Sequence, residues 1–508
     1  MRYRGHPAHL AIGLGLLGGS ARGQSLVDPA LQVTTYACCP QQPTSFAFLP
    51  GPPGGPAHLL VCEKATGRVL HFQDGQVQGI ALDVAVDFDG ERGLLGIAVH
   101  PDFAQNGLVY LDYTSSATGQ DTADPAGALD NRVVRSCWDG ATLGAPQLVL
   151  QLPTTPTSYH QGGVILFGPD RLLYGVIGNL GRDGQLQNIS DGSPPDDTSI
   201  VFRIRDDGMP PADNPFFGLG GPMQKVYAYG IRNSFGLDFD PVSNVLWDTE
   251  NGPASYDEVN RMPPGSNSGY ALIMGPDARD PQGVGDLWQA PGSHYEDPQF
   301  SWYRTIAPTG IHFLRSDALG EPYRDDCFVG AFNTKSIYHF ELTADRSALV
   351  MPDPSVADLV ADTPAERDLF LWGSGFGGIT GLATGPDGAL YVLSYESERV
   401  FRIARAPLAD SGPGPSSLSS RGGLQVWPNP FRSRTRLFLP DRQHDPGGVL
   451  RIYSVTGRLV RALRPAGSAL EWDGVDRDGC AAAPGTYLVR LENAGGEPCL
   501  EAKLVRVR

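Results

Sequence analysis

Four short blocks of the sequence carry side chains whose types can do chemistry. The first contains Glu91, the second His160, the third Arg232, and the fourth is an oxygen-rich loop around Gly252–Pro253. A histidine titrates near neutral pH and can accept a proton from a hydroxyl group. A fixed guanidinium stabilises negative charge that develops on a neighbouring oxygen. Together these types indicate proton abstraction next to a stabilised anion.

Each of these residues also has a purely structural interpretation. Glu91 could cap the glycine-rich turn in which it lies, and a single histidine beside two glycines is more often structural than catalytic. Arg232 could pair with an acidic neighbour. Asp257 and Glu258 could support their loop or occupy a second site. The residue types alone therefore leave the function open.

The elements that must position these side chains are indicated by a recurring turn pattern. An aromatic or apolar residue is followed by proline, often by aspartate, and then by a β-rich run. Copies occur at Phe48–Pro50, Val99–Asp102, Phe167–Asp170, Phe239–Pro241 and Thr384–Gly388, with a degenerate copy near Phe313–Phe328. Proline, aspartate and glycine favour tight turns between strands. Six such units predict an all-β fold, a six-bladed β-propeller over residues 24–409.

The repeat ends after Ala404, and a different composition follows. Residues 410–423 are rich in serine, glycine and proline, which is typical of a flexible linker. Residues 424–508 alternate short β-rich runs, as a small Ig-like β-sandwich would. This segment resembles the C-terminal sorting domains of type IX secretion and the Ig-like module of flagellar hook-cap proteins. The resemblance implies cell-surface attachment, with a plain accessory domain as the alternative.

Composition agrees with many short strands joined by turns. The chain has 64 glycines and 44 prolines, and no long stretch has the spacing of an amphipathic helix, so helix content should be low. The net charge of −17 would repel nucleic acid. An acidic surface mainly keeps a protein soluble, and calcium binding by some of the carboxylates is the alternative.

The N-terminal segment, residues 1–23, is typical of an export signal. Arg2 and Arg4 precede the apolar run Leu10–Gly19, and small residues precede Gln24. The apolar run is too short to span a bilayer. We therefore expect an exported protein that is periplasmic, at the cell surface or extracellular.

The chain has 7 cysteines, an odd number for an oxidising compartment. Their spacing matches no zinc pattern, and structural disulfides are the better interpretation. Cys480 and Cys499 lie in one small region and could pair. Cys38 or Cys39 could reach Cys62 across a hairpin, and the pairing is left open.

The four blocks resemble the motifs of the soluble glucose/sorbosone dehydrogenase family. Residues 90–103, GERGLLGIAVHPDF, are similar to its first signature. The blocks HQGGVILFGPD from residue 160, YGIRNSFGLDF from residue 229 and ENGPASYDEVN from residue 250 are similar to its later motifs, in the same order. The resemblance implies a propeller that oxidises a sugar with pyrroloquinoline quinone (PQQ) and Ca²⁺.

The resemblance also implies individual roles. His160 is the general base, and Arg232 contacts the quinone and the reacting oxygen. Glu91 and Asn233 lie near the cofactor. The carbonyl groups of Gly252–Pro253 hold the Ca²⁺ that anchors the quinone and polarises its carbonyl.

The chain departs from the family pattern at three places. Asn179 stands where the family has the aspartate that orients the histidine, and this should lower the basicity of His160 unless Asp183 compensates. Asn333 stands where a cation is expected, and Lys335 could substitute from the same face of an extended strand. The segment Gly377–Leu382 lacks the arginines that clamp the cofactor carboxylates, a loss that weakens cofactor binding.

The sequence therefore predicts a calcium- and quinone-dependent dehydrogenase that oxidises an aldose-type sugar and passes electrons to an external acceptor. The alternative is a non-catalytic surface propeller that binds a glycan or a protein, which the departures favour. A calcium-dependent lactone hydrolase is a third possibility, which the Glu91 and His160 blocks disfavour. Trp302 is a candidate for stacking on a sugar, with core packing as its alternative.

Overall fold

The computed structural model describes residues 23–281, 283–406 and 424–506, the last range with gaps at 428, 430, 432–433, 440–447, 456, 465–468, 478 and 494–497. The chain divides into two compact units, residues 1–406 and 407–508. Apart from Gly23, the predicted signal peptide and the predicted linker lie outside the described residues.

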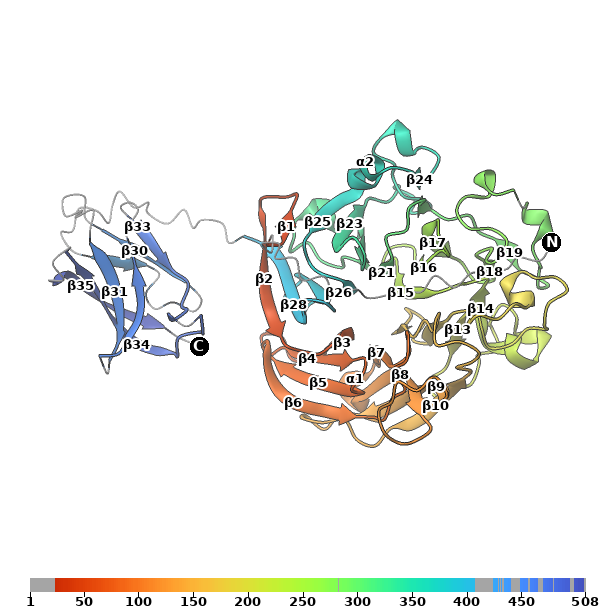
Figure 1. The fold of residues 1–508 in the computed structure, drawn as a ribbon, viewed down its shortest axis with the longest axis horizontal. Coiled ribbons are helices and arrows are strands. Elements are labelled where there is room, and N and C mark those ends of the chain that lie inside the picture. The colour runs from red at the N-terminus through yellow and green to blue at the C-terminus, as the bar shows by residue number, and fades with distance from the viewer. Residues whose placement is uncertain are drawn as a thin grey trace. The chain divides into compact units, whose positions relative to one another are not determined.

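The first unit is the predicted six-bladed β-propeller, built from six antiparallel sheets (Figure 1). Blade 1 contains β3 (Pro43–Leu49), β4 (His58–Glu63), β5 (Arg68–Gln73) and β6 (Gln76–Asp83). Blade 2 contains β7 (Leu94–Val99), β8 (Leu108–Ser116), β9 (Ala128–Cys137) and β10 (Gln147–Leu152). Blade 3 contains β11 (Ile165–Phe167), β12 (Leu173–Ile177), β13 (Ile200–Ile204) and β14 (Val226–Tyr229), extended by the short parallel strands β18 (Ser266–Asn267) and β19 (His294–Tyr295).

The other three blades follow the same order. Blade 4 contains β15 (Ser234–Phe239), β16 (Leu246–Glu250), β17 (Asp257–Met262) and β20 (Phe300–Trp302), with β24 (Val360–Ala361) at its edge. Blade 5 contains β21 (Pro308–Phe313), β22 (Cys327–Ala331), β23 (Ser336–Phe340) and β25 (Leu371–Ser374), with β1 (Ser25–Leu26) at its edge. Blade 6 contains β26 (Ile379–Thr384), β27 (Leu390–Ser394), β28 (Arg399–Arg405) and β2 (Leu31–Cys38).

The ring is closed by strand β2, which comes from the N-terminal side of the chain. It pairs antiparallel with β28, from Leu31 opposite Arg405 to Cys38 opposite Arg399. Blade 6 is therefore assembled from both ends of the propeller. The first strands of the blades contact one another in the order β3, β7, β11, β15, β21, β26 and back to β3, so these six are the innermost strands.

The hydrophobic core lies between the blades and not along the axis. Six clusters of buried side chains each join two neighbouring blades, for example Leu60 of β4 with Leu111 of β8, and Phe72 of β5 with Leu393 of β27. Around the axis the backbones crowd together. A Cβ added at Gly236 of β15 would lie 2.0 Å from the Thr309 carbonyl oxygen of β21.

The recurring turn of the sequence has one structural position. Each copy lies at the end of an innermost strand, where the chain turns toward the second strand of the blade: after β3, β7, β11, β15, β21 and β26. The runs that follow, such as Leu173–Ile177 and Leu390–Ser394, are buried along their whole length. The prediction of one turn per blade is confirmed.

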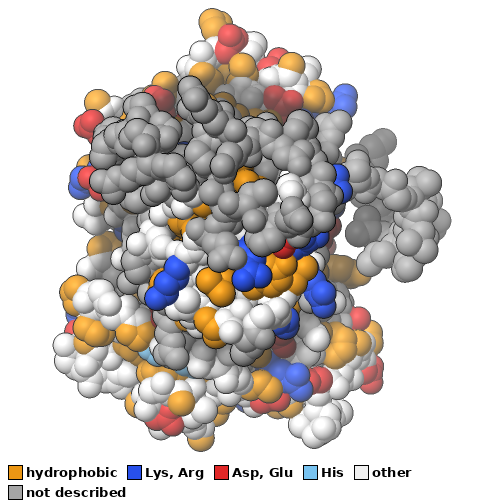
Figure 2. Space-filling model, turned by 90° about the vertical axis from the view of Figure 1, so that its left-hand side faces the viewer, with side chains coloured by type: hydrophobic (Ala, Val, Ile, Leu, Met, Phe, Trp, Pro, Cys, Tyr) orange, Lys and Arg blue, Asp and Glu red, His pale blue; other side chains and the backbone are white. Residues whose placement is uncertain are grey.

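Helical segments are short, as predicted. The described residues form two α-helices, α1 (Phe103–Asn106) and α2 (Pro364–Arg367). They also form 3₁₀ turns at Gln185–Gln187, Phe217–Leu219, Gly221–Lys225, Asp277–Arg279, Val284–Asp286, Glu321–Tyr323, Pro354–Val356 and Asp368–Phe370. None of the described helices has the length and apolar character needed to cross a bilayer. Figure 2 shows both acidic and basic side chains among the described residues.

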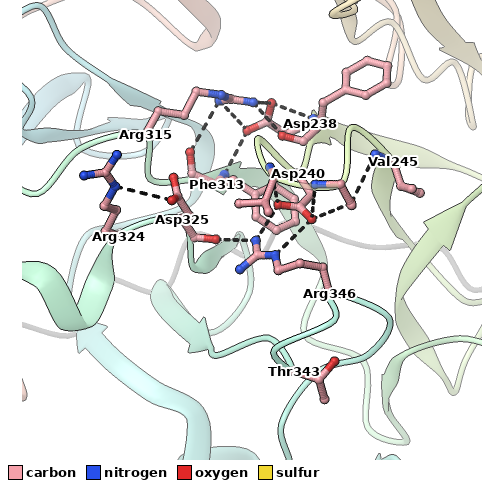
Figure 3. A network of polar contacts seen from close by, with 12 residues as sticks. Asp238, Asp240, Val245, Phe313, Arg315, Arg324, Asp325, Thr343 and Arg346 are labelled. Atoms are coloured by element: carbon pink, nitrogen blue, oxygen red, sulfur yellow. Dashed lines mark hydrogen bonds and ion pairs between the residues drawn. The ribbon is translucent and has the colours of Figure 1, made fainter.

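Two buried carboxylates of blade 4 join it to blade 5 (Figure 3). Asp238 of β15 receives two hydrogen bonds from the Arg315 guanidinium, at 2.6 and 3.0 Å, and lies 3.0 Å from Nδ1 of His312. Asp240 receives two from Arg346, at 2.5 and 3.0 Å. Burial alone would raise the pKa of Asp238, but Arg315 and His312 outweigh it and hold that pKa well below its usual range.

The second unit consists of two antiparallel sheets that share one core. The first contains β29 (Gln425–Trp427), β30 (Thr435–Phe438) and β33 (Ala469–Trp472). The second contains β31 (Val449–Ser454), β32 (Leu459–Leu463), β34 (Gly485–Glu492) and β35 (Pro498–Arg506). Leu437, Trp472, Ile452 and Val489 meet in the core between them. This arrangement is a small β-sandwich.

The predicted disulfides are not formed. Cys38, Cys39, Cys62, Cys137, Cys327 and Cys480 are all free thiols. The prediction for Cys62 is wrong because its side chain is packed in the core between blades 1 and 2, whereas Cys38 and Cys39 are exposed at the end of β2 in blade 6. Cys480 is a free, exposed thiol, and the side chain of Cys499 lies outside the described residues.

Candidate active site

The predicted catalytic side chains come from segments that lead into innermost strands. Glu91 precedes β7, His160 precedes β11, and Arg232 and Asn233 directly precede β15. Since every innermost strand begins at the same face of the propeller, these segments from blades 2, 3 and 4 converge at that face. The structure therefore brings together the residues of these three sequence blocks, and the fourth block adjoins them because Arg232 donates to Glu250 and Asn251.

Glu91 holds the three segments to one another. Its Oε2 accepts hydrogen bonds from the His160 backbone N–H at 2.7 Å and from Nδ2 of Asn233 at 2.9 Å. Burial raises the pKa of this carboxyl, and the two hydrogen bonds together with the charge of Arg232 oppose the rise. Glu91 thus positions the candidate base, which is more than capping its own turn. A contact of Glu91 with a cofactor stays a prediction.

His160 is half-buried and is oriented by Asn179. The imidazole Nδ1 lies 2.6 Å from the Asn179 side-chain oxygen. Because an amide oxygen can only accept, this contact keeps the proton on Nδ1 and leaves the lone pair on Nε2. The backbone of His160 is in the left-handed region, with φ of 60°, which is uncommon for a residue other than glycine. Such local strain is typical of functional positions.

The pKa of His160 is lowered to about 4. Burial is the largest cause, the positive charge of Arg232 is the second, and the hydrogen bond to Asn179 opposes them. The predicted direction is therefore correct, although burial and Arg232 account for it rather than the missing aspartate alone. Asp183 is exposed and is not among the groups that act on His160, so it does not replace that carboxylate.

Asn179 is itself fixed in orientation. Its backbone N–H donates to the Arg232 carbonyl oxygen at 2.9 Å, and its Nδ2 donates to the Arg182 carbonyl and to the Tyr270 hydroxyl oxygen, each at 3.2 Å. With Nδ2 committed to two acceptors, the amide oxygen faces His160. Tyr270 lies ten residues beyond the fourth sequence block and was given no role there. Its role depends on a contact with a residue 91 positions away, which no local pattern reveals.

Arg232 keeps its charge available. Its backbone N–H donates to Oε1 of Glu250 at 2.6 Å, and its Nη1 donates to the Asn251 carbonyl oxygen at 2.8 Å. No salt bridge of Arg232 occurs within the described part of the chain. The structural alternative, an arginine neutralised by an acidic neighbour, is therefore not what the structure has. The guanidinium lies near His160 as a positive group without a carboxylate partner.

A cluster of buried carboxyl groups begins at Glu250, which accepts the Arg232 backbone N–H. Glu250 and Glu258 lie opposite each other on β16 and β17, and Asp248 lies two residues before Glu250 on the same strand. All three are almost fully buried. Burial raises the pKa of each, and for Glu250 and Glu258 repulsion by neighbouring carboxylates adds to the rise, which favours the protonated form. A protonated Glu250 can fix the backbone of Arg232 without quenching its charge.

The Gly252–Pro253 loop is held by Asp257. One Asp257 carboxylate oxygen accepts from the Gly252 N–H at 2.9 Å, and the other accepts from the N–H groups of Ile306 and Ala307 at 2.6 and 2.8 Å. A Cβ added at Gly252 would lie 2.1 Å from the Ser255 carbonyl oxygen, so only glycine fits. Asp257 therefore supports the loop, one of its two predicted roles.

The candidate oxygen ligands for Ca²⁺ at this loop are backbone carbonyl groups. Among the described residues, no group of three or more histidine, cysteine, aspartate or glutamate side chains could hold a metal ion. The Gly252 and Pro253 carbonyl groups take part in no hydrogen bond between described residues, and Pro253 is exposed. These carbonyls fit the prediction for Ca²⁺, which accepts backbone oxygens in flexible geometry.

Lys335 does not lie where it was predicted. Strand β22 ends at Ala331, and Lys335 lies in the turn before β23 with φ of 58°, so it shares no strand face with Asn333. Its Nζ is 2.7 Å from Oε2 of Glu396, which also accepts the Gly378 N–H at 3.2 Å. Lys335 is thus beside the segment Gly377–Leu382, which lacks arginines, but its charge is paired with the Glu396 carboxylate.

Trp302, the predicted sugar contact, lies in the core, and Lys64 is an additional cation near Glu91. Trp302 is 1% exposed and packs against Phe300 and Tyr338 in the core between blades 4 and 5, so its sugar-stacking role is wrong. Lys64, which follows β4, was missed by the sequence reasoning. Burial lowers its pKa, the nearby Glu91 opposes this, and its Nζ donates to the Phe88 carbonyl oxygen at 3.0 Å.

The fold and this site define a class: a six-bladed propeller with a half-buried histidine and an arginine without a salt bridge in the segments that lead into its inner strands. Comparison with known proteins agrees. The family model described as Glucose / Sorbosone dehydrogenase matches residues 40–402. Since this is more than half of the chain, the protein belongs to the glucose/sorbosone dehydrogenase family.

Three relatives illustrate the similarity. The chain is 29% identical over 365 residues to the aldose sugar dehydrogenase YliI of Escherichia coli, covering 70% of this chain and 87% of the relative. It is 32% identical over 238 residues to quinoprotein glucose dehydrogenase B of Acinetobacter calcoaceticus, covering 43% and 48%. The PQQ-bound aldose sugar dehydrogenase of Streptomyces coelicolor is 25% identical, with a TM-score of 0.54, covering 76% and 99%.

Proposed function

We propose that this protein oxidises the C1 hydroxyl of an aldose-type sugar to a lactone, with Ca²⁺-bound PQQ as cofactor and an external electron acceptor. The observation that carries the proposal is the His160 imidazole. Asn179 holds its Nδ1 proton, its Nε2 lone pair is free, and the unpaired cation Arg232 lies nearby. A neutral base next to a positive group suits removal of a proton from a hydroxyl.

The residues present fit the cofactor in part. Asn233 has a buried side-chain oxygen without a partner, and the Gly252–Pro253 carbonyls are free for a cation. These groups, with Arg232, would hold the quinone and Ca²⁺. Lys335 would reach a cofactor carboxylate only by leaving Glu396. When bound, PQQ supplies a two-electron acceptor for the hydride from the sugar.

The chain's own residues then have distinct tasks. Nε2 of His160 takes the proton of the C1 hydroxyl, and Asn179 keeps the ring in the tautomer that allows this. Arg232 stabilises negative charge on the reacting oxygen. Glu91 keeps the His160 and Asn233 segments in register, and Asp257 keeps the Gly252 loop in shape.

Cofactor binding is tested by titrating the purified protein with PQQ in the presence and absence of Ca²⁺ while following the quinone absorbance. We expect calcium-dependent binding that Gly252→Ala weakens by about tenfold or more, because the new Cβ would push against the Ser255 carbonyl and reshape the loop. Gly218→Ala is the matched control, since a Cβ there meets nothing within 4 Å. Equal binding by both variants would remove the Gly252 loop from the cofactor site.

The role of Asn179 predicts a shift in pH dependence. His160 must be neutral to act as a base, so activity falls as pH drops through its pKa of about 4. Asn179→Asp places a negative charge at the imidazole Nδ1 and should raise the pKa of His160. The midpoint of the acid limb in the pH profile of kcat/KM should therefore shift upward by about 1–3 pH units. Asn179→Ala adds no charge and should leave the limb acidic. An Asn179→Asp profile that overlays the wild type would contradict the assignment of His160.

A second candidate function is a non-catalytic propeller that binds a glycan or a protein. It is favoured by the pairing of Lys335 with Glu396 and by the absence of arginine from Gly377–Leu382, which leave the cofactor carboxylates without their expected partners. Glycan-array binding together with no calcium-dependent quinone binding would support this function over the first.

We also propose that the protein is exported and that the C-terminal unit serves in surface attachment. The basis is the N-terminal sequence and the resemblance of residues 424–508 to sorting modules. N-terminal sequencing of the protein from its native cell envelope should begin at Gln24. Deleting residues 410–508 should release the propeller from the cell surface, whereas unchanged surface retention would contradict the attachment role.

A further inference from the structure

Two neighbouring exposed thiols stand outside everything described for the site. Cys38 is the last residue of β2, and Cys39 is the first residue of the turn that leads into blade 1. The Cys39 thiol donates to the Cys38 sulfur across 2.8 Å. A disulfide bond is about 2.05 Å long. The two sulfurs thus lie close to bonding distance while both remain thiols.

The backbone holds this arrangement. In a regular strand successive side chains point to opposite faces, which would separate the sulfurs. Here Cys38 is paired with Arg399 of β28, and the Cys39 N–H donates to the Glu398 carbonyl oxygen at 2.8 Å. Cys39 adopts a left-handed φ of 77° and breaks the alternation, so both sulfurs lie on one side. A left-handed conformation at a residue other than glycine is strained, and strain of this kind marks functional positions.

The two thiols are not equivalent. The pKa of Cys39 is raised, first because its S–H is donated to Cys38 and second through partial burial, and Arg399 opposes the rise. The Cys39 S–H is engaged with the Cys38 sulfur, and we therefore take Cys38 as the sulfur that reacts first. The other cysteines of the propeller differ. Cys62 and Cys327 are buried with raised pKa values and are inert, and Cys137 is exposed without a neighbouring thiol.

The thiol pair lies on the candidate active-site face. Strand β2 runs toward the end of the propeller where the innermost strands begin, because Cys38 pairs with the first residue of β28 and the chain then enters β3. The neighbouring turn between β27 and β28 carries Glu396, the partner of Lys335. The thiol pair therefore lies where strand β2, which closes the ring, ends and the chain continues into blade 1.

We propose that Cys38 and Cys39 form a redox-active dithiol, which a small-molecule disulfide converts to a disulfide between adjacent residues. The Cys38 thiolate attacks one sulfur of the reagent, a mixed disulfide forms, and one thiolate leaves. Cys39 then gives up its proton and attacks the Cys38 sulfur, which displaces the second thiolate. Two protein thiols are oxidised and one disulfide reagent is reduced to two thiols, so atoms and electrons balance.

The test uses the full chain, fully reduced, and oxidised glutathione as the probe. After reaction at pH 8 the protein is quenched with acid, alkylated under denaturing conditions and digested with chymotrypsin. Cleavage after Tyr36 and Phe46 gives a peptide, residues 37–46, in which Cys38 and Cys39 are the only cysteines. We expect this peptide to be two hydrogens lighter than the dithiol and free of glutathione and alkyl groups. Cys137, the internal control, should carry glutathione because it has no second thiol nearby.

Two variants keep the result decisive. In Cys39→Ser the glutathione should remain on Cys38, since no second thiol can displace it. In Cys38→Ser the remaining thiol, Cys39, should likewise keep its glutathione. The proposal is overturned if the wild-type peptide keeps its glutathione as Cys39→Ser does. It is equally overturned if both thiols of the peptide stay alkylatable while Cys137 has reacted.

Discussion

Replacing His160 by alanine should lower kcat/KM for aldose oxidation by about 10²–10⁴-fold, the range that general-base catalysis contributes. The reason is local: Nε2 of His160 is the free lone pair at the site, and its pKa of about 4 keeps it unprotonated at neutral pH. Steady-state kinetics with PQQ, Ca²⁺ and an artificial electron acceptor measure the effect. Quinone binding should persist, because Arg232, Asn233 and the Gly252 loop are untouched.

The matched control is another histidine of the propeller. His294 is exposed and lies at the edge of blade 3, with Glu296 as its neighbour, so His294→Ala should retain full activity. Turnover that survives unchanged in His160→Ala would exclude this residue as the base. Such a result, combined with intact quinone binding, would move the proton-accepting role to another group at the face.

The second large effect concerns stability. Asp238→Asn should lower the free energy of unfolding of the propeller by about 2–4 kcal/mol, because it removes the charge that Arg315 contacts in Figure 3 and that His312 contacts at 3.0 Å. The upper end of the range for a buried ion pair does not apply, since the Arg315 side chain is 40% exposed and water takes over part of the role of Asp238. Denaturant unfolding followed by near-ultraviolet circular dichroism measures the change.

The effect should depend on pH in a defined direction. The pKa of Asp238 is depressed in the folded protein, so its contribution is complete above the unfolded value of about 3.9 and is lost as pH falls toward the folded value. The difference in unfolding free energy between the wild type and Asp238→Asn should therefore begin to shrink below about pH 4 and should keep shrinking as pH falls further. Asp83→Asn breaks a pair whose two side chains are about half exposed, and it should change stability by less than about 1 kcal/mol. Equal losses in both variants would contradict the importance of burial.

The blade architecture could be predicted because its signal is local. Each turn such as Val99–Asp102 or Phe239–Pro241 combines a proline that presets φ with an aspartate that bonds the nearby backbone, and the strand that follows is apolar. Such a unit needs only about ten residues of sequence to be recognised, and six of them fix the fold. The segments with Glu91, His160 and Arg232 could be placed for the same reason, since each lies directly before an innermost strand.

What the sequence could not show depends on contacts between distant segments. The prediction for Lys335 assumed an unbroken strand, but strand β22 ends at Ala331 and the chain turns there. Lys335 forms a salt bridge with Glu396 of blade 6 instead. Trp302 was a candidate for sugar stacking because it is an aromatic residue near the Pro308–Gly310 segment. In the structure its ring contacts Phe300 and Tyr338, which sequence alone does not show. The raised pKa values of Glu250, Glu258 and Asp248 are also invisible in sequence, because they follow from burial.

Strand β2 has a practical consequence for anyone who produces this protein. The family match begins at residue 40, two residues after β2 ends at Cys38. A recombinant fragment trimmed to the matched range would lack the strand that pairs with β28 and would expose the backbone N–H and C=O groups of that edge to other molecules. Such a fragment should aggregate through its open sixth blade, whereas one that begins at Gln24 keeps the ring closed.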